Sequence, residues 1–339
     1  MKILEPVYDV IIYNRSLKKI ASYILRSKLF SGNPAYNLFY RKVIHARMNK
    51  FQEIPFRVMI ENTNICNADC IFCPHKSMKR KNGIMDTELS KRIIDECSFL
   101  GIKYVTVYGF GEPLSDPHFF KRVEYAKSKN IARVTTNTNA MYLNLKNRQD
   151  LLSCGVDEVY ISFDAATAQT LKKVRPNLDF CVVEDNVLQL LKEKATRKLK
   201  NPKVYLSFVE SQINRHEVGA YMSKWKNKVD GISVSIIHNW TGNISSEQKP
   251  DKKFRRDPCR LLWTDMVISF NGDVPLCCND FENAVILGNI KNDSIKEIWS
   301  GATLNRIREQ HKSLEFDKTP ICKNCEYNYH FKSPWWVGK

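Results

Sequence analysis

Three cysteines lie within eight residues, at Cys66, Cys70 and Cys73, separated by three and then by two residues. Thiolates at this spacing, directly after a strand, can bind three irons of a cubic iron–sulfur cluster and leave the fourth iron without a protein ligand. Two other interpretations stay open, namely a zinc site with His75 as the fourth ligand and three buried cysteines that bind nothing. The short loop favours the cluster.

A second group of four cysteines lies toward the end of the chain. Its members are Cys259, Cys277, Cys322 and Cys325. Asn271-Gly272 predicts a hairpin turn that returns Cys277 to the vicinity of Cys259. Four thiolates can complete the coordination of one iron–sulfur cluster, or they can hold one zinc ion. The spacing alone does not choose between these metals.

The remaining four of the 11 cysteines are Cys97, Cys154, Cys181 and Cys278. We predict structural roles for all of them, since free cysteine often behaves as a small core residue. Cys278 follows directly after a proposed ligand. Because neighbouring side chains on a strand point to opposite faces, its thiol should face away from that of Cys277.

The composition is that of a globular protein with a large core. The chain has 339 residues, of which 43% are hydrophobic and 11% aromatic, which excludes global disorder. The sequence has no run of 18 or more uncharged apolar residues, so we expect no membrane-spanning helix. Its first residues lack a small-residue cleavage site, so we do not expect export. An odd number of cysteines at metal-binding spacings suits a reducing compartment. We therefore expect a cytoplasmic protein.

The elements that position the cysteines follow an alternating pattern from about residue 55 to 240. Six β-rich runs occupy 56–61, 104–109, 132–137, 158–164, 204–210 and 232–237. Each of the first five runs is followed by helical patterns. These cover 86–99, 116–129, 144–153, a stretch that ends at about 198, and 214–227. This alternation predicts an α/β fold with a parallel sheet, closed or nearly closed into a barrel. After Pro250 we expect a hairpin around Asn271-Gly272 and a helix around 294–309.

We predict three regions, at 1–54, 55–245 and 255–339. The first carries ten basic and three acidic residues, a large share of the total charge of +17, and 16–30 has amphipathic helical spacing. Two interpretations stay open for this helical extension: a solvated face packed on the barrel, or a surface for an anionic membrane or an acidic substrate carrier. Nucleic acid is not expected, since no interleaved aromatics or known module occur.

The first cysteine group resembles the signature of the radical S-adenosylmethionine (SAM) superfamily, with Phe72 as the aromatic residue before the third cysteine. Gly109-Phe110-Gly111-Glu112-Pro113 resembles the family's Gly-Gly-Glu-Pro element, which binds the methionyl amino group through residues such as Gly111 and Glu112. Thr138-Asn139-Ala140 resembles the family's Thr-Asn-Gly turn, although Thr136-Asn137 is an alternative alignment. Residues 162–164, with Ser162 and Asp164, occupy the place where the family contacts the ribose.

The second cysteine group resembles the twitch domain, the shortened form of the SPASM extension of these enzymes. No cysteine follows Cys325, so we expect one auxiliary cluster. The two resemblances imply a partial (β/α)6 TIM-like barrel with a small cysteine-rich C-terminal domain. They imply as cofactors a SAM-binding [4Fe-4S] cluster, one auxiliary [4Fe-4S] cluster and SAM, with a reducing partner such as flavodoxin or ferredoxin.

The implied activity is that of a radical SAM oxidoreductase, in which a 5′-deoxyadenosyl radical abstracts hydrogen from the substrate. A single twitch cluster is similar to the arrangement in aminocyclitol dehydrogenases, so we expect oxidation of a sugar, aminocyclitol or sugar-nucleotide. Modification of a ribosomal peptide or protein, and a non-catalytic zinc-binding adaptor, are the alternatives. The catalytic residues stay unknown at this stage. Glu210 and His238 stand at the ends of strands where a base could lie, but a structural cap or a satisfied polar group is the other interpretation of each, so neither is assigned to the site.

Overall fold

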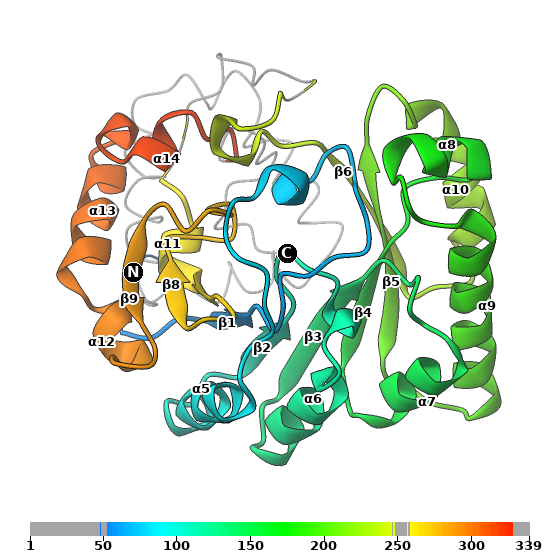
Figure 1. The fold of residues 1–339 in the computed structure, drawn as a ribbon, viewed down its shortest axis with the longest axis horizontal. Coiled ribbons are helices and arrows are strands. Elements are labelled where there is room, and N and C mark those ends of the chain that lie inside the picture. Colours follow the sequence, from blue (N-terminus) through cyan, green and yellow to red (C-terminus); the bar gives the residue numbers. More distant parts are fainter. Residues whose placement is uncertain (1–47, 49–52, 246, 248–255, 257, 328–339) are drawn as a thin grey trace, which may run out of the picture.

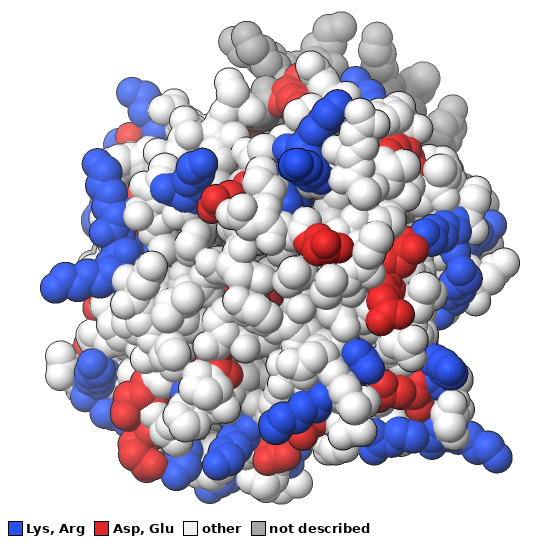
Figure 2. Space-filling view, turned by 45° about the vertical axis from the view of Figure 1, so that its right-hand side comes forward, with Lys and Arg blue, Asp and Glu red and all other residues white. Residues whose placement is uncertain are grey.

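The structure is a computed structural model that describes residues 48, 53–245, 247, 256 and 258–327. The predicted helical extension over 1–54 lies almost entirely outside these residues. Within the described part of the chain, no helix combines the length and apolar character needed to cross a bilayer. On the face that Figure 2 shows, Lys and Arg side chains are interspersed with Asp and Glu around a largely uncharged centre. That face has no continuous basic patch of the kind that binds nucleic acid.

A seven-stranded parallel sheet forms the centre of the molecule, with the strand order β6-β5-β4-β3-β2-β1-β7 (Figure 1). Its strands are β1 (Arg57–Ile60), β2 (Tyr104–Val107), β3 (Arg133–Thr138), β4 (Glu158–Ser162), β5 (Lys203–Glu210), β6 (Gly231–Ile236) and β7 (Asp265–Ile268). All six strands that the sequence predicts are present, and all pairs are parallel. The predicted α/β partial barrel is confirmed, with one strand more than expected.

Helices follow the strands and cover the outer face of the sheet (Figure 1). They are α5 (Thr87–Phe99), α6 (Phe119–Ser128), α7 (Leu145–Ser153), α8 (Ala168–Val174), α9 (Phe180–Thr196) and α10 (Val218–Trp225). Side-chain caps fix the starts of α5, α7 and α9, since Asp86, Asn144 and Asp179 each accept a hydrogen bond from a backbone N–H three residues later. Strands covered on both faces are buried along their length, and in β2 the residues Val105, Thr106 and Val107 are all buried.

The C-terminal region corrects one prediction. β7 pairs with β1 in the main sheet, and β8 (Asp273–Pro275) pairs with β9 (Ile286–Asn289), so the expected hairpin of two paired strands around Asn271-Gly272 does not form. A tight turn does occur there, with a φ of +93° at Gly272. β7 pairs with β1 instead because of contacts between distant segments. It is fully buried beside β1, and Asp265 forms an ion pair with Arg57, its register partner.

The helix expected over 294–309 is two helices, α12 (Ile295–Trp299) and α13 (Ala302–Lys312), interrupted at Gly301. The remaining helices of this region are α11 (Leu261–Thr264) and α14 (Pro320–Lys323). Short 3-10 helices are η1 (Pro74–Ser77), η2 (Pro113–Ser115), η3 (Arg215–Glu217), η4 (Trp240–Gly242) and η5 (Phe316–Lys318). These pieces place the second cysteine group next to the sheet edge formed by β7.

Candidate active site

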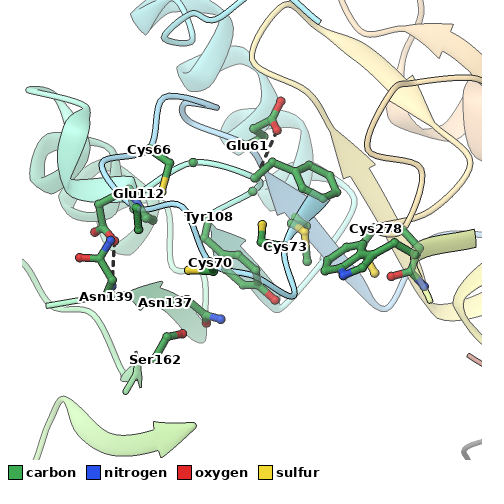
Figure 3. A pocket seen from close by; sticks show the side chains of 18 of the residues that line it. Glu61, Cys66, Cys70, Cys73, Tyr108, Glu112, Asn137, Asn139, Ser162 and Cys278 are labelled. Carbon is green, nitrogen blue, oxygen red and sulfur yellow. Dashed lines mark hydrogen bonds between the residues drawn. The ribbon is translucent and has the colours of Figure 1, made fainter. Parts of the chain in front are cut away.

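The carboxyl ends of the strands open into a cavity of about 360 Å³ (Figure 3). In a parallel barrel this is the edge at which active sites lie. Eight residues that the sequence nominates line it together: Cys66, Cys70, Cys73, Phe72, Gly111, Glu112, Asn139 and Ser162. The three thiols and Phe72 come from the loop after β1, and the other groups come from the ends of β2, β3 and β4. The structure therefore brings the motifs of four strands into one pocket.

The cysteine loop is held by hydrogen bonds from several directions. Asp69 and Ile71 donate through their backbone N–H groups to Pro176 and Val174, which lie after and in α8. His75 hydrogen-bonds through Nε2 to the backbone carbonyl of Asn64 at 2.7 Å and does not line the cavity. That contact argues against His75 as a fourth metal ligand. The three thiols consequently remain a set of three donors.

Burial affects the protonation of these thiols. Desolvation raises the pKa of Cys66 to about 12 and that of Cys73 to about 11. It also raises the pKa of Cys70, although the Arg175 guanidinium acts in the opposite direction. Cysteines bind metal as thiolates, so binding of iron releases protons from these thiols. The positive charge of the iron then stabilises the buried thiolates.

Glu112 is buried at the end of β2 and held by residues from the end of β3. Its carboxylate accepts hydrogen bonds from Thr138 Oγ1 at 2.6 Å and from the backbone N–H of Asn139 at 2.8 Å. Burial raises the pKa of Glu112, and these two donors oppose the rise. Asn139 in turn donates to Asn67, inside the cysteine loop, at 2.7 Å. Of the two possible alignments, residues 138–140 therefore form the turn that contacts Glu112, although Asn137 also lines the cavity.

The two glycines of the segment 109–113 are required by close approach. A Cβ on Gly111 would lie 2.6 Å from the Thr63 carbonyl oxygen and 2.7 Å from that of Ile65, both in the backbone of the cysteine loop. A Cβ on Gly109 would lie 2.4 Å from Cγ of Glu61. Because real Cβ atoms do not occupy such distances, a side chain at 111 displaces the backbone of the loop that carries the thiols, and one at 109 displaces the side chain of Glu61. Phe110, which stands between the glycines, points to Trp240 instead.

Substitution of Gly111 by alanine is expected to weaken SAM binding by about tenfold or more, because the loop backbone must shift to remove the overlap. Calorimetric titration of the anaerobically reconstituted protein with SAM measures this. Gly219→Ala is the matched control, since a Cβ at Gly219 meets nothing within 4 Å. Equal SAM affinity in the two variants would contradict the close-packing explanation.

Asp164 does not lie where the sequence placed it. The resemblance put it against the ribose, but its side chain is fully buried, does not line the cavity, and accepts hydrogen bonds from Arg175 and from the backbone N–H of Val209. The role the structure supports is to hold Arg175. Burial alone would lower the pKa of Arg175, but Asp164 raises it overall, so the guanidinium stays charged.

Arg175 is a residue that the sequence gave no reason to select. It follows α8, lines the cavity, and donates to the Cys70 sulfur at 3.0 Å, while its guanidinium lies 5.2 Å from the centre of the Phe72 ring. No short motif surrounds it, and only the tertiary structure brings it from 175 to the cysteine loop. It supplies a positive charge for an anionic group beside the cluster site.

The two strand-end residues considered as bases differ. His238 lines the cavity, with its ring 4.2 Å from that of Trp240, whose Nε1 donates to the backbone carbonyl of Phe72 at 2.8 Å. Glu210 does not line the cavity and lies 3.6 Å from Arg215 in an ion pair. Of the two, His238 alone is positioned to reach a bound substrate.

The second cysteine group lines a smaller cavity of its own. Cys259, Cys277, Cys322 and Cys325 all belong to its wall, although they come from segments as far apart as 259 and 325. Arg256 donates to the backbone carbonyls of Cys322 and Lys323, which fixes the last pair. Among the residues the structure describes, no three His, Cys, Asp or Glu side chains converge as ligands of a single metal ion. The four thiols line one space of about 20 Å³, which brings together the four donors that an iron–sulfur cluster would need.

Cys277 and Cys278 face different cavities. Cys277 lines the small cavity, whereas Cys278 lines the large one, which confirms that the two side chains point to opposite sides. Asn279 lines both. The structural role predicted for Cys278 overlooked this position, because a strand pattern gives the direction of a side chain and not what lies in that direction.

Comparison with known proteins supports both sites. The family model described as the radical SAM superfamily matches residues 60–201, and that of the SPASM iron–sulfur cluster-binding domain matches 259–326. The S-adenosyl-L-methionine-dependent 2-deoxy-scyllo-inosamine dehydrogenase of Niallia circulans is 24% identical over 79% of this chain and 91% of its own length. The tungsten-containing aldehyde ferredoxin oxidoreductase cofactor-modifying protein of Pyrococcus furiosus is 32% identical over 33% of this chain and 32% of its own length.

Solved structures show the same fold. BtrN in complex with AdoMet and 2-DOIA superposes with a TM-score of 0.55 at 20% identity, covering 80% of this chain and 93% of BtrN. Streptococcus suis SuiB bound to its precursor peptide SuiA gives 0.61 at 17% identity, covering 79% of this chain and 70% of SuiB. The two domains carry a SAM-binding [4Fe-4S] cluster and an auxiliary iron–sulfur cluster, and the cysteines of the two cavities fit them. This chain belongs to the radical SAM superfamily and carries a C-terminal SPASM-type iron–sulfur domain.

Proposed function

We propose that this protein oxidises a secondary alcohol of a sugar, aminocyclitol or sugar-nucleotide to a ketone. The observation that carries the proposal is the segment 277–279 between the two cavities. Cys277 lines the small auxiliary cavity, Cys278 lines the large pocket, and Asn279 lines both. An electron acceptor held by the four thiols would therefore lie close to the large pocket, which favours electron transfer from a substrate radical.

When bound, the cofactors supply a 5′-deoxyadenosyl radical from SAM, which takes a hydrogen atom from the substrate, and an auxiliary cluster that accepts the remaining electron. The chain's own residues bind and orient these groups. Cys66, Cys70 and Cys73 hold the first cluster. Glu112 accepts hydrogen bonds from the methionyl ammonium, and Arg175 pairs with the methionyl carboxylate.

Other pocket residues complete this assignment. Gly111 offers backbone to the methionyl group, while Asn139 and Ser162 contact the nucleoside; Phe72 packs against the guanidinium of Arg175. His238 takes the hydroxyl proton that leaves when the alcohol becomes a ketone. All of these residues line the same cavity, which supports the proposed roles.

The size of the pocket supports a small substrate. A volume of about 360 Å³ lies near the lower end of the roughly 300–1,000 Å³ that ligand pockets span, which favours a small molecule over a peptide. The relative matched over 91% of its length is named as a dehydrogenase of an aminocyclitol. A flavodoxin or ferredoxin as reductant, a cytoplasmic location and a membrane or carrier contact through residues 1–54 belong to the same proposal.

The proposal is tested by turnover with SAM, a reductant and a panel of aminocyclitols, sugars and sugar-nucleotides deuterated at the carbinol carbon. We expect deuterium in 5′-deoxyadenosine and one ketone formed for each deoxyadenosine. Deuterium transfer that occurs only with peptide substrates would overturn the assignment in favour of peptide modification.

A second outcome at the same site is favoured by Cys278, whose thiol lines the large pocket. If the substrate radical took a hydrogen atom from Cys278, an S–H bond would break, a C–H bond would form, and the product would be an epimer. The sulfur radical would then need one electron and one proton, and the neighbouring auxiliary cluster is the source of the electron. Turnover in D2O separates the outcomes, since the epimer carries solvent deuterium at carbon and the ketone does not.

A further inference from the structure

His311 lies beside the auxiliary cysteines and has no part in the function proposed above. It stands in the last turn of α13, and its side chain is only 1% exposed. Its ring lines the small cavity together with the four cysteines of the second group. The ring of Phe316 packs against it edge-on at 4.9 Å between centroids, which fixes its orientation. The imidazole therefore faces the space where the auxiliary cluster binds.

The two ring nitrogens of His311 have different surroundings. Nδ1 accepts a hydrogen bond from the backbone N–H of Cys259 at 3.1 Å. A nitrogen that accepts must present its lone pair, so the proton of the neutral ring is on Nε2. Nε2 is buried and has no hydrogen-bond partner in the described ranges of the chain. A buried donor without a partner is rare and costly, which points to a partner outside the polypeptide.

We infer that the Nε2–H of His311 donates a hydrogen bond to a sulfur of the auxiliary cluster and thereby raises its reduction potential. Reduction adds negative charge to the cluster, and a donor to sulfur stabilises the more negative form. His311 is not itself an iron ligand, because four thiols already serve four irons and Nε2 keeps its proton. Whether the substrate is a sugar or a peptide does not enter this inference.

The test is a redox titration of the anaerobically reconstituted full-length protein, followed by electron paramagnetic resonance. His311→Leu removes the donor, and His311→Gln can keep both an acceptor for Cys259 and a donor toward the cluster. We expect the auxiliary midpoint potential to fall in the leucine variant and to be largely restored in the glutamine variant. The SAM-binding cluster should not change, and Phe316→Leu controls for altered packing.

An unchanged auxiliary potential in a His311→Leu protein with full iron content would overturn the inference. If that variant does not assemble the cluster, a measurement on the parent protein tests the inference instead. Labelling with 15N-histidine should then give a 15N hyperfine coupling on the reduced auxiliary cluster, and this coupling should be absent from a His311→Gln protein. A parent protein without the coupling would show that His311 does not contact the cluster.

Discussion

Replacement of Cys70 by alanine is expected to abolish SAM cleavage. Cys70 is the middle thiol of the loop, and removing it leaves two cysteines for a cluster that needs three protein ligands. Its sulfur also accepts the hydrogen bond from Arg175 at 3.0 Å, which is lost in the variant. Since changes even outside the ligand sphere cost about 10–100-fold, loss of a ligand should exceed about 100-fold.

The measurement is 5′-deoxyadenosine formation with dithionite, scored beside the iron content of the same sample. Cys181→Ala is the matched control, because Cys181 is exposed and lines neither cavity. We expect the control to cleave SAM at the parent rate. Cleavage by the Cys70 variant at a comparable rate would contradict the assignment of the first site.

Replacement of Cys322 by alanine is expected to separate cleavage from product formation. Cys322 lines the auxiliary cavity and does not line the pocket of the first site. Without an electron acceptor, the substrate radical cannot complete a two-electron oxidation, although the first cluster still reduces SAM. We therefore expect measurable deoxyadenosine with at least about tenfold less ketone for each deoxyadenosine formed, a change of about 1.4 kcal/mol in partition.

Both quantities come from one chromatographic assay of the same reaction. Cys154→Ala is the control, because Cys154 is also buried but belongs to neither cavity. It should lower stability without changing the ratio of ketone to deoxyadenosine. If Cys322→Ala lost both activities to the same extent, the second site would be architectural, with no part in the chemistry.

Local sequence features predicted most of the barrel. Each of its strands is a β-rich run, and capping residues such as Asp86 and Asn144 mark where the following helices begin. The short spacings of Cys66, Cys70 and Cys73 and of Cys322 and Cys325 also nominated thiols that the structure places in the two cavities, because ligands within one loop lie at short distances along the chain. The barrel predictions, which rest on neighbouring residues, are confirmed.

What the sequence did not predict depends on contacts between distant segments. β7 looked like one half of a hairpin, and only its pairing with β1 shows that it extends the sheet. Asp164 looked like a ribose contact, whereas its partner Arg175 carries the charge into the pocket. Gly111 was selected by resemblance alone, and its reason is the backbone of the cysteine loop lying against it. Such reasons exist only in the folded protein.

The central claim is that the thiols of Cys66, Cys70 and Cys73 leave one iron free to bind SAM. It is tested most directly by electron–nuclear double resonance on the reduced protein, prepared without oxygen and mixed with SAM labelled with 15N and 17O in its methionyl group. We expect nitrogen and oxygen couplings on a [4Fe-4S] signal, since the amino and carboxyl groups of SAM would bind the fourth iron. A cluster signal that the labelled nucleotide leaves unchanged would contradict it.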